Sequence, residues 1–276
     1  MKFRPEIKIL ILNWNGVDDL DSCLESIQKI KYDNFTTTVI DNGSKDDSCD
    51  MIEKKYSKVD IIRIDKNLGY SKGYNYAFNM LKKDNFKYYL ILNNDTVVDE
   101  FILDNFIKNS NFYGEENIYS AKINFMDSDI IWYAGGKVCK FLGLTYHKFI
   151  YKIENLQKYK TSKTDYVSGC CMFVSKDLIN KLKGFKEEYK MYYEDVDLCL
   201  RAKQFNSNCY IIEESTIFHK VSGSIGNNSL NKTIMKMQSQ IKFMFLNNNL
   251  FIFVLGLLIN MLLLPIYLIK FIYEKF

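Results

Sequence analysis

Short apolar runs alternate with amphipathic stretches along the N-terminal part of the chain. A short apolar run is typical of a strand buried on both faces, and apolar residues three or four positions apart predict a helix. The predicted strands cover residues 7–12, 36–40, 61–64 and 87–92, and the predicted helices between them cover 20–30, 46–56 and 71–82. This alternation predicts βαβ units, and therefore a mostly parallel sheet with right-handed crossovers.

The rest of the chain has a less regular pattern. It predicts a strand at 167–174, helices at 176–182 and 195–203, and another strand at 209–212. Cys170 and Cys171 fall in the first of these strands, so we expect them in the core. The stretch at 134–163 is rich in lysine and tyrosine and shows neither period, so we expect a mobile or acceptor-binding loop there.

The C-terminal part is strongly apolar, and no Asp, Glu, Lys or Arg occurs from Phe243 to Ile269. Residues 233–246 predict a basic amphipathic helix of the kind that lies in a membrane interface. Residues 250–269 would form a helix about 30 Å long, which matches the core of a bilayer. We therefore expect this tail to insert in a membrane, either spanning it or only entering it. A buried core helix is the alternative.

Composition narrows the class of protein. The chain has 276 residues, of which 47% are hydrophobic and 25% charged, and this excludes a disordered chain. The net charge of +4 comes without a basic cluster, so we expect no nucleic-acid partner. With only two histidines, a His-rich metal site is excluded. The cysteines include no C-x-x-C pair and no secretory signal opens the chain, so we expect reduced thiols in a cytoplasmic protein.

Polar residues follow each of the four predicted N-terminal strands. In open parallel sheets, ligands bind beyond the carboxyl ends of the strands, so these residues are expected to meet in one crevice. They are Asn13 and Asn15, then Asp41 and Asn42, then Asp65 and Asn67, and finally Asn93, Asn94 and Asp95. The sequence therefore predicts a ligand site at this edge of an α/β fold.

Four segments in this order resemble glycosyltransferase family 2. They are ILNWNG (11–16), VIDNGSKDDS (39–48), NLGYSKGYN (67–75) with LILNNDTVVD (90–99), and YYEDVDLCLRA (192–202). The resemblance covers about residues 5–225 and is strongest to the branch that is similar to bacterial rhamnosyltransferases of surface polysaccharide synthesis. It implies a GT-A type α/β fold, with a Rossmann-like, mostly parallel central sheet flanked by helices, to which the tail would add membrane-associated helices.

The resemblance assigns the donor side of the site. Asp41 would accept a hydrogen bond from the base of a UDP- or dTDP-linked sugar, with Asn13 and Asn15 framing the same base. Read from the residues alone, Asp41 equally fits an Asx-turn before Gly43. The other residues that the resemblance assigns to nucleotide-sugar binding are Asn67, Gly69, Gly73, Asn94 and Gly169.

The family's Asp-x-Asp signature falls on Asn93-Asn94-Asp95, so asparagine replaces the first aspartate. The resemblance makes Asp95 the ligand of Mg²⁺ or Mn²⁺ on the donor diphosphate, and His219 would complete the metal shell. One carboxylate is sufficient for a hard cation that takes other ligands from phosphate and water. The plainer alternatives are a loop cap for Asp95 and a structural role for His219. The backbone N–H groups of residues 222–224 are a further candidate contact for phosphate.

The Glu194-Asp195 pair carries the predicted chemistry. The resemblance makes Asp195 the general base that takes the proton of the acceptor hydroxyl, and Glu194 would raise the pKa of Asp195 by like-charge repulsion. Without the resemblance, both residues fit the acidic start of a helix. Arg201 is spaced to form an ion pair with a carboxylate such as Asp197.

These observations combine into one expected enzyme, an inverting glycosyltransferase that transfers rhamnose or another hexose from a nucleoside-diphosphate donor to a hydroxyl of a lipid-linked saccharide. Residues 1–100 would form its nucleotide-sugar half, 101–225 its acceptor and catalytic half, and 226–276 a tail tethering it to the cytoplasmic face of the cell membrane. The alternatives are a polyprenyl-phosphate glycosyltransferase and a non-catalytic GT-A-like binding module.

Overall fold

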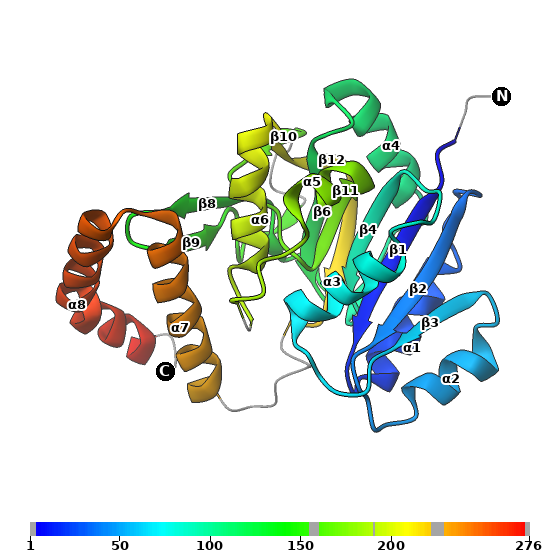
Figure 1. The fold of residues 1–276 in the computed structure, drawn as a ribbon, viewed down its shortest axis with the longest axis horizontal. Helices are drawn as coiled ribbons and strands as arrows, with labels where there is room; N and C mark the ends of the chain where they lie inside the picture. The colour runs from blue at the N-terminus through cyan, green and yellow to red at the C-terminus, as the bar shows by residue number, and fades with distance from the viewer. Residues whose placement is uncertain (1–3, 155–159, 190, 222–228, 274–276) are drawn as a thin grey trace.

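The computed structural model describes residues 4–154, 160–189, 191–221 and 229–273, and its helices flank one large twisted sheet (Figure 1). The N-terminal half alternates strands and helices. Its elements are β1 (Ile7–Asn13), α1 (Val17–Ile27), β2 (Phe35–Asp41), α2 (Ser48–Lys55), β3 (Val59–Arg63), α3 (Tyr70–Met80) and β4 (Tyr88–Asn93). The four strands and three helices predicted from periodicity are therefore confirmed, with small shifts at their ends.

The strands of this half run parallel in the order β3-β2-β1-β4. Asn13 pairs in register with Asp41, and Leu12 pairs with Asn93. The register brings the carboxyl ends of β1, β2 and β4 to one edge of the sheet. The polar residues that follow these strands therefore gather at that edge, as predicted.

The second half makes the sheet mixed, which corrects the expectation of a mostly parallel sheet. Its strands are β5 (Thr96–Val97), β6 (Ile118–Phe125), β7 (Ile131–Tyr133), β10 (Ser162–Thr164), β11 (Cys171–Ser175) and β12 (Cys209–His219). β11 lies between β4 and β6 and is antiparallel to both, while β12 is parallel to β6. The helices of this half are α4 (Ile102–Tyr113), α5 (Lys176–Leu182) and α6 (Glu194–Ala202).

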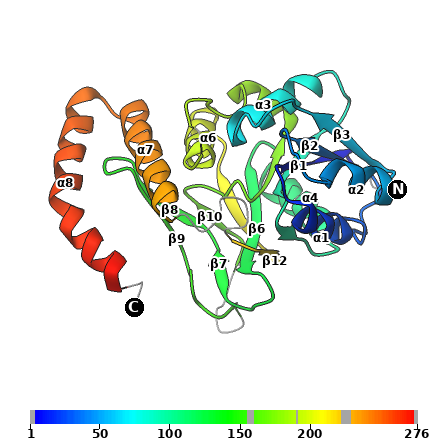
Figure 2. The ribbon, with the colours of Figure 1, turned by 90° about the horizontal axis from the view of Figure 1, so that it is seen from below.

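The region predicted as an aperiodic loop contains a hairpin. β8 (Gly136–Cys139) pairs antiparallel with β9 (Leu144–His147), and β10 joins the edge of the main sheet beside β12. Short strands of this kind leave too few alternating positions for a period to appear in the sequence. Figure 2 shows the hairpin projecting from the sheet toward the C-terminal helices.

The core lies on both faces of the sheet. Side chains of β1, β4 and β11 are almost wholly buried, as expected for central strands covered by helices. Cys170 and Cys171 are buried, which confirms their predicted place in the core. The strand there starts at Cys171 instead of residue 167, because Ser168, Gly169 and Cys170 form a turn at the site edge.

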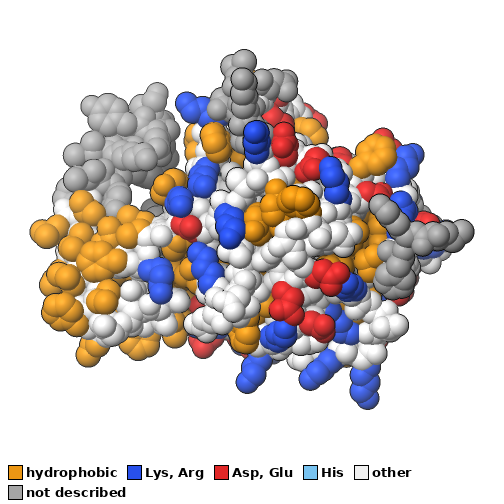
Figure 3. Space-filling view, turned by 90° about the horizontal axis from the view of Figure 1, so that it is seen from above, with side chains coloured by type: hydrophobic (Ala, Val, Ile, Leu, Met, Phe, Trp, Pro, Cys, Tyr) orange, Lys and Arg blue, Asp and Glu red, His pale blue; other side chains and the backbone are white. Residues whose placement is uncertain are grey.

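The C-terminal segment forms α7 (Ser229–Asn247) and α8 (Leu250–Tyr273), which lie side by side at one end of the molecule (Figures 1 and 2). α7 turns Phe243 and Met244 inward and leaves Ile234 and Phe245 exposed. Exposed apolar side chains also line α8, and Figure 3 shows them gathered at this end. They are Leu250, Phe251, Val254, Leu255, Leu258, Met261 and Leu262.

The membrane tether predicted for this segment is wrong. Within the residues that the structure describes, no helix is long and apolar enough to cross a membrane. One side of α8 is instead committed to the rest of the chain: the Asn260 side-chain amide donates to the carbonyl of Leu142 at 3.2 Å, and a β-carbon on Gly256 would lie 2.5 Å from the Phe141 oxygen. The expected anchoring at the cytoplasmic face of a membrane is therefore unsupported.

Candidate active site

The first part of the site joins the ends of β1 and β4. The Asn94 side-chain amide donates to Asn13 Oδ1 at 2.8 Å, and Asn13 donates to Ser44 Oγ at 3.3 Å. The same hydroxyl accepts the backbone N–H of Asn15 at 3.0 Å, and the Asn15 side chain accepts the N–H of Lys45 at 2.7 Å. Asn13, Asn15 and Asn94 are therefore brought together, with Ser44 as the shared partner that the sequence did not single out.

The second part joins the end of β2 to the loop before α3. Asp41 is buried, and its Oδ1 accepts the backbone N–H of Ser44 at 3.2 Å. An Asx-turn would instead use the N–H two residues on, that of Gly43, so this contact is a related local bond that holds the carboxylate in place at the site edge. Next to it, the Asn42 side chain binds two consecutive residues of the loop. Its Nδ2 donates to Asn67 Oδ1 at 3.1 Å, and its Oδ1 accepts the N–H of Leu68 at 2.9 Å.

Gly69, at the end of this loop, and Gly73, inside α3, are each required to be glycine for a different structural reason. Gly69 precedes the first residue of α3 with a φ of 81°, a left-handed conformation that glycine adopts without strain. Gly73 faces β1, where a β-carbon would lie 2.7 Å from Leu12 Cδ1. Its small size lets α3 approach the sheet closely and so places the loop at 67–69 beside the strand ends.

Asp95 and His219 form the third part. His219 ends β12, which pairs with β5, and its Nε2 lies 3.1 Å from Asp95 Oδ1. Both side chains are buried, and the ring of Trp132 packs edge-on against His219 at 4.8 Å between centroids. Two residues far apart in sequence are thus placed together, as the predicted metal site requires. Residues 222–224, the further phosphate candidate, lie outside the described residues.

The chemistry of this pair fits a divalent cation. Within the described residues, His219 Nδ1 is buried without a hydrogen-bond partner, and Asp95 Oδ1 is buried with the His219 Nε2 contact at 3.1 Å in place of a hydrogen bond, an arrangement that is costly unless another group completes it. The part of the chain that the structure describes contains no cluster of three or more His, Cys, Asp and Glu residues suited to a metal. Among the described residues, Asp95 and His219 would be the ligands, and the remaining ones would come from phosphate and water.

Glu194 and Asp195 are the first two residues of α6, and Glu194 is buried while Asp195 is half-buried. Asp195 is held by two backbone N–H groups: Gly169 donates to Oδ2 at 2.9 Å and Val196 donates to Oδ1 at 2.8 Å. Burial raises the pKa of Asp195, while these N–H groups oppose the rise. Burial and the Asp195 charge raise the pKa of Glu194 to about 8. The like-charge effect that the sequence predicted on Asp195 therefore falls on Glu194, whose Oε2 is buried without a partner.

Two residues with strained backbone precede α6, and an ion-pair network holds its first turns in place. Tyr192 and Tyr193 have φ values of 69° and 71°, which bulky residues rarely adopt. Asp197, whose side chain is fully buried, accepts from Arg201 Nε at 2.6 Å and lies 3.2 Å from Lys186 Nζ. The predicted pairing of Arg201 is thus confirmed, and it anchors the helix that carries Asp195.

The turn at 168–170 connects the strand ends to the Glu-Asp pair. The Cys170 carbonyl accepts the N–H of Asn93 at 3.1 Å, while the Gly169 N–H binds Asp195. Burial raises the pKa of the Cys170 thiol in this turn, and the charges of Asp95 and Asp195 raise it further. The carboxylates predicted for metal binding and for catalysis therefore lie on either side of one turn.

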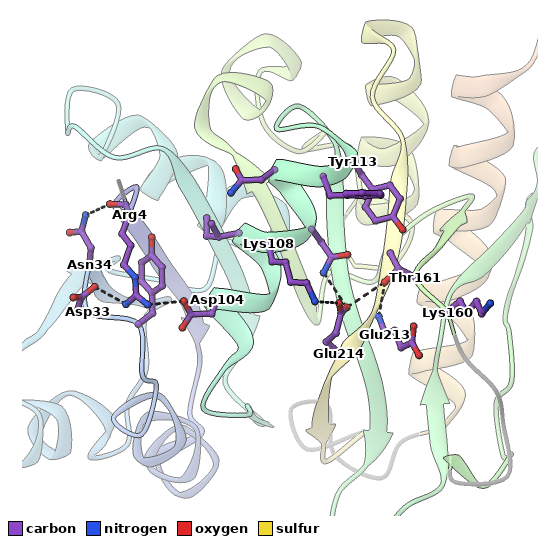
Figure 4. Close-up of a pocket in the computed structure, with 15 residues that line it drawn as sticks. Arg4, Asp33, Asn34, Asp104, Lys108, Tyr113, Lys160, Thr161, Glu213 and Glu214 are labelled. Atoms are coloured by element: carbon purple, nitrogen blue, oxygen red, sulfur yellow. Dashed lines mark hydrogen bonds and ion pairs between the residues drawn. The ribbon is translucent and has the colours of Figure 1, made fainter. Parts of the chain in front are cut away.

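A separate groove of about 1550 Å³ lies at α4 and the bend of β12, and none of the predicted site residues lines it (Figure 4). Most of its charged groups pair with one another, since Arg4 contacts Asp104 at 3.1 Å and Lys108 contacts Glu214 at 2.9 Å. Because its acidic and basic side chains are matched in this way, the groove offers little attraction to a diphosphate.

Two residues that contribute to the site did not stand out in the sequence. Ser44 accepts a hydrogen bond from the predicted donor residue Asn13, and Tyr70 donates through its hydroxyl to the Gly169 carbonyl at 2.7 Å. Both fall inside the motif segments 39–48 and 67–75. Their motif position was a usable signal, but side chains that bind the backbone of other site residues follow no recognisable spacing.

Known proteins with similar sequences give the family. Residues 8–183 match the family described as Glycosyl transferase family 2. Poly-beta-1,6-N-acetyl-D-glucosamine synthases of two Staphylococcus aureus strains, MSSA476 and MW2, are 28% identical over 105 residues, which cover 36% of this chain and 25% of each synthase. The chain therefore matches about a quarter of the length of these relatives.

Solved structures share the fold. GalNAc-T7 with UDP, GalNAc and Mn²⁺ superposes with a TM-score of 0.66 at 14% identity, over 79% of this chain and 44% of that one. Mannosyltransferase PcManGT from Pyrobaculum calidifontis, with GDP-Man and Mn²⁺, gives 0.64 at 12% identity, over 88% and 64%. S. aureus TarS 1-349 with UDP gives 0.57 at 14% identity, over 76% and 60%. The fold is of the GT-A type, and the chain belongs to glycosyl transferase family 2.

Proposed function

We propose that the protein is an inverting glycosyltransferase that transfers a hexose from a nucleoside-diphosphate donor to a hydroxyl of a lipid-linked saccharide. The observation that carries this proposal is the half-buried Asp195 carboxylate, which the Gly169 N–H holds at 2.9 Å and which only the 168–170 turn separates from the strand ends. Membership of the family and the similarity to polysaccharide synthases support it.

In this proposal Asp195 is the general base. The acceptor oxygen forms its bond to the anomeric carbon while the bond from that carbon to the diphosphate breaks on the opposite face, and the hydroxyl proton passes to Asp195. Burial raises the pKa of Asp195, which makes its carboxylate a better proton acceptor than an exposed one. Glu194 retains its proton near neutrality, so the pair presents one negative charge to the acceptor.

On the donor side, Asp41, Asn13 and Asn15 would bind the base, and the loop at 67–69 would lie along the nucleotide. Asp95 and His219 would hold a divalent ion, as their unsatisfied buried atoms suit. When bound, such an ion neutralises charge on the leaving diphosphate. The Mn²⁺ present in the GalNAc-T7 and PcManGT structures supports this assignment.

The first test is a thermal-shift panel of UDP-, dTDP- and GDP-sugars with and without Mn²⁺, since binding to the folded state raises its stability. We expect one nucleotide sugar, together with Mn²⁺, to raise the melting temperature of the protein. The panel includes dTDP-rhamnose because of the sequence resemblance. A panel in which no nucleotide sugar stabilises the protein would favour the non-catalytic binding module.

The second test uses the donor found by the panel with two acceptors, a lipid-linked saccharide and a bare polyprenyl phosphate. Transfer to the saccharide with inversion at the anomeric carbon is expected. Transfer to the lipid phosphate alone would instead establish the polyprenyl-phosphate glycosyltransferase, whose acceptor needs no strong base.

A further inference from the structure

Tyr70 connects the predicted donor loop to the predicted base. It is the first residue of α3 and follows Gly69, whose N–H binds Asn67 Oδ1 at 2.8 Å. The Tyr70 hydroxyl donates to the carbonyl of Gly169 at 2.7 Å. The N–H of the same glycine donates to Asp195 Oδ2 at 2.9 Å. Gly169 is thus held from its two ends by Tyr70 and by Asp195.

The contact leaves no room for a side chain at Gly169. A β-carbon there would lie 2.5 Å from the Tyr70 hydroxyl oxygen, 3.1 Å from its Cζ and 3.5 Å from Asp195 Cβ. The phenol ring is fixed by Tyr74 at 4.7 Å and Phe185 at 5.5 Å between centroids. Burial raises the pKa of Tyr70 well above its ordinary value, so the hydroxyl stays a donor at all working pH values.

We infer that Tyr70 is a positioning residue for Asp195. By holding Gly169 against the carboxylate, its hydroxyl keeps the base oriented and ties that orientation to the loop at 67–69. This inference rests on the proposed function, because it takes Asp195 as the base. Tyr70 itself touches neither reacting group and acts only through Gly169.

The charge environment of Asp195 makes a pH profile a usable readout. The titratable groups that face it are Glu194 and Cys199 from its own helix, Tyr193 from the residue before that helix and, from other elements, Tyr70, Tyr133, Tyr166 and Cys170. Every tyrosine and cysteine of this set has a raised pKa and stays neutral near pH 7, which leaves Glu194 as the neighbour that titrates.

The experiment is Tyr70→Phe, which removes one hydroxyl and keeps the ring. We expect kcat to fall about tenfold, the energy of one well-placed hydrogen bond, with the KM for the donor within about twofold. Asp195 loses a firmly held N–H that lowers its pKa, so the acid limb of the kcat profile should move to higher pH by about half a unit.

The matched control is Tyr119→Phe, which removes a similar hydrogen bond from a tyrosine hydroxyl to the Gly114 carbonyl, at 2.6 Å and away from the site. It should lower stability while leaving kcat and the acid limb unchanged. If Tyr70→Phe does not fold, Gly169→Ala carries the test, because its methyl group pushes against the phenol and displaces the same N–H.

A double-mutant cycle completes the design. Gly169→Ala should cost less kcat in the Tyr70→Phe background, where the 2.5 Å clash with the hydroxyl is absent. Strictly additive losses, or a Tyr70→Phe enzyme with the wild-type kcat and pH profile, would overturn the inference. Asp195→Asn distinguishes failure of the proposed function from failure of this inference. If that variant transfers sugar at the normal rate, Asp195 is not the base and the proposed function is wrong, independently of the Tyr70→Phe result.

Discussion

Two carboxylate sites lie on either side of one turn and differ in what surrounds them. Asp95 meets an imidazole brought from the end of β12, with His219 Nε2 at 3.1 Å. Asp195 meets a second carboxyl group, Glu194, and two backbone N–H groups. An acid beside an unsatisfied imidazole suits a cation, whereas an acid beside another acid in a buried position suits a proton.

In the proposed function, the same residue type would therefore acquire separate roles from its neighbours. The two sites share the edge of one sheet, but they are built by different strands and helices. Substitutions on one side should therefore change metal and donor binding, and substitutions on the other should change turnover. Four variants test that separation.

Asp195→Asn should lower the rate of transfer by about 10²- to 10⁴-fold, the usual contribution of a general base. The amide cannot accept the acceptor proton, yet it keeps an oxygen for the Gly169 N–H. Thermal shifts with the donor and Mn²⁺ should stay close to those of the wild type. Loss of donor binding together with turnover would mean that the two sites are not separate.

Asp197→Asn tests a third carboxylate on the same helix, which we expect to serve stability alone. It leaves Arg201 and Lys186 without their buried partner, and removing one member of such a pair costs about 3 kcal/mol or more. Urea unfolding measures the loss. Glu53→Gln, which breaks the exposed pair with Arg63, is the matched control and should change stability by less than about 1 kcal/mol.

His219→Ala should weaken Mn²⁺-dependent donor binding by at least about 10- to 100-fold, because removing even a group that only supports a metal ligand costs that much. The effect should be seen in the Mn²⁺ concentration that gives half-maximal activity, with saturating Mn²⁺ restoring much of the rate. An unchanged Mn²⁺ requirement would return His219 to a structural role. Trp132→Phe keeps a ring against His219 and serves as the control.

Glu194→Gln should change the pH dependence of stability. Because the native pKa is raised to about 8, the wild type holds a proton that the unfolded chain releases near pH 4.5, so its free energy of unfolding falls as pH rises to about 8. The glutamine variant lacks this fall and should gain at least about 1 kcal/mol relative to the wild type between pH 5 and pH 9. Unfolding curves at the two values measure it.

The parallel half of the fold was predictable because each of its strands is a run of apolar residues followed by a helical period. β11 was predicted without its direction, since a buried strand reads the same in parallel and antiparallel sheets. The hairpin of β8 and β9 was missed because strands of four residues give too little alternation. The membrane insertion predicted for the tail was wrong, because it rested only on the length of the apolar run. In the structure, Asn260 and Gly256 contact the hairpin of β8 and β9 along one side of α8.

The site was predictable where a residue follows a strand or belongs to a motif. The gathering of Asn13, Asp41 and Asn94 at one edge follows from parallel register alone. The contact of Asp95 with His219 depends on the long path of β12 across the sheet, which local pattern does not contain. Likewise, nothing in sequence spacing placed Tyr70 on Gly169, because that contact joins two separate loops.

The buried thiols give the molecule internal reporters of local opening. Cys170 and Cys199 are buried beside the turn and helix that hold Asp195, whereas Cys139 on the hairpin is exposed. A thiol reagent should therefore modify Cys139 at once and reach the other two only when the protein opens, since it attacks the accessible thiolate. The rate of slow labelling at Cys170 and Cys199 therefore measures how often the region around Asp195 opens, and no cysteine has to be introduced for the measurement.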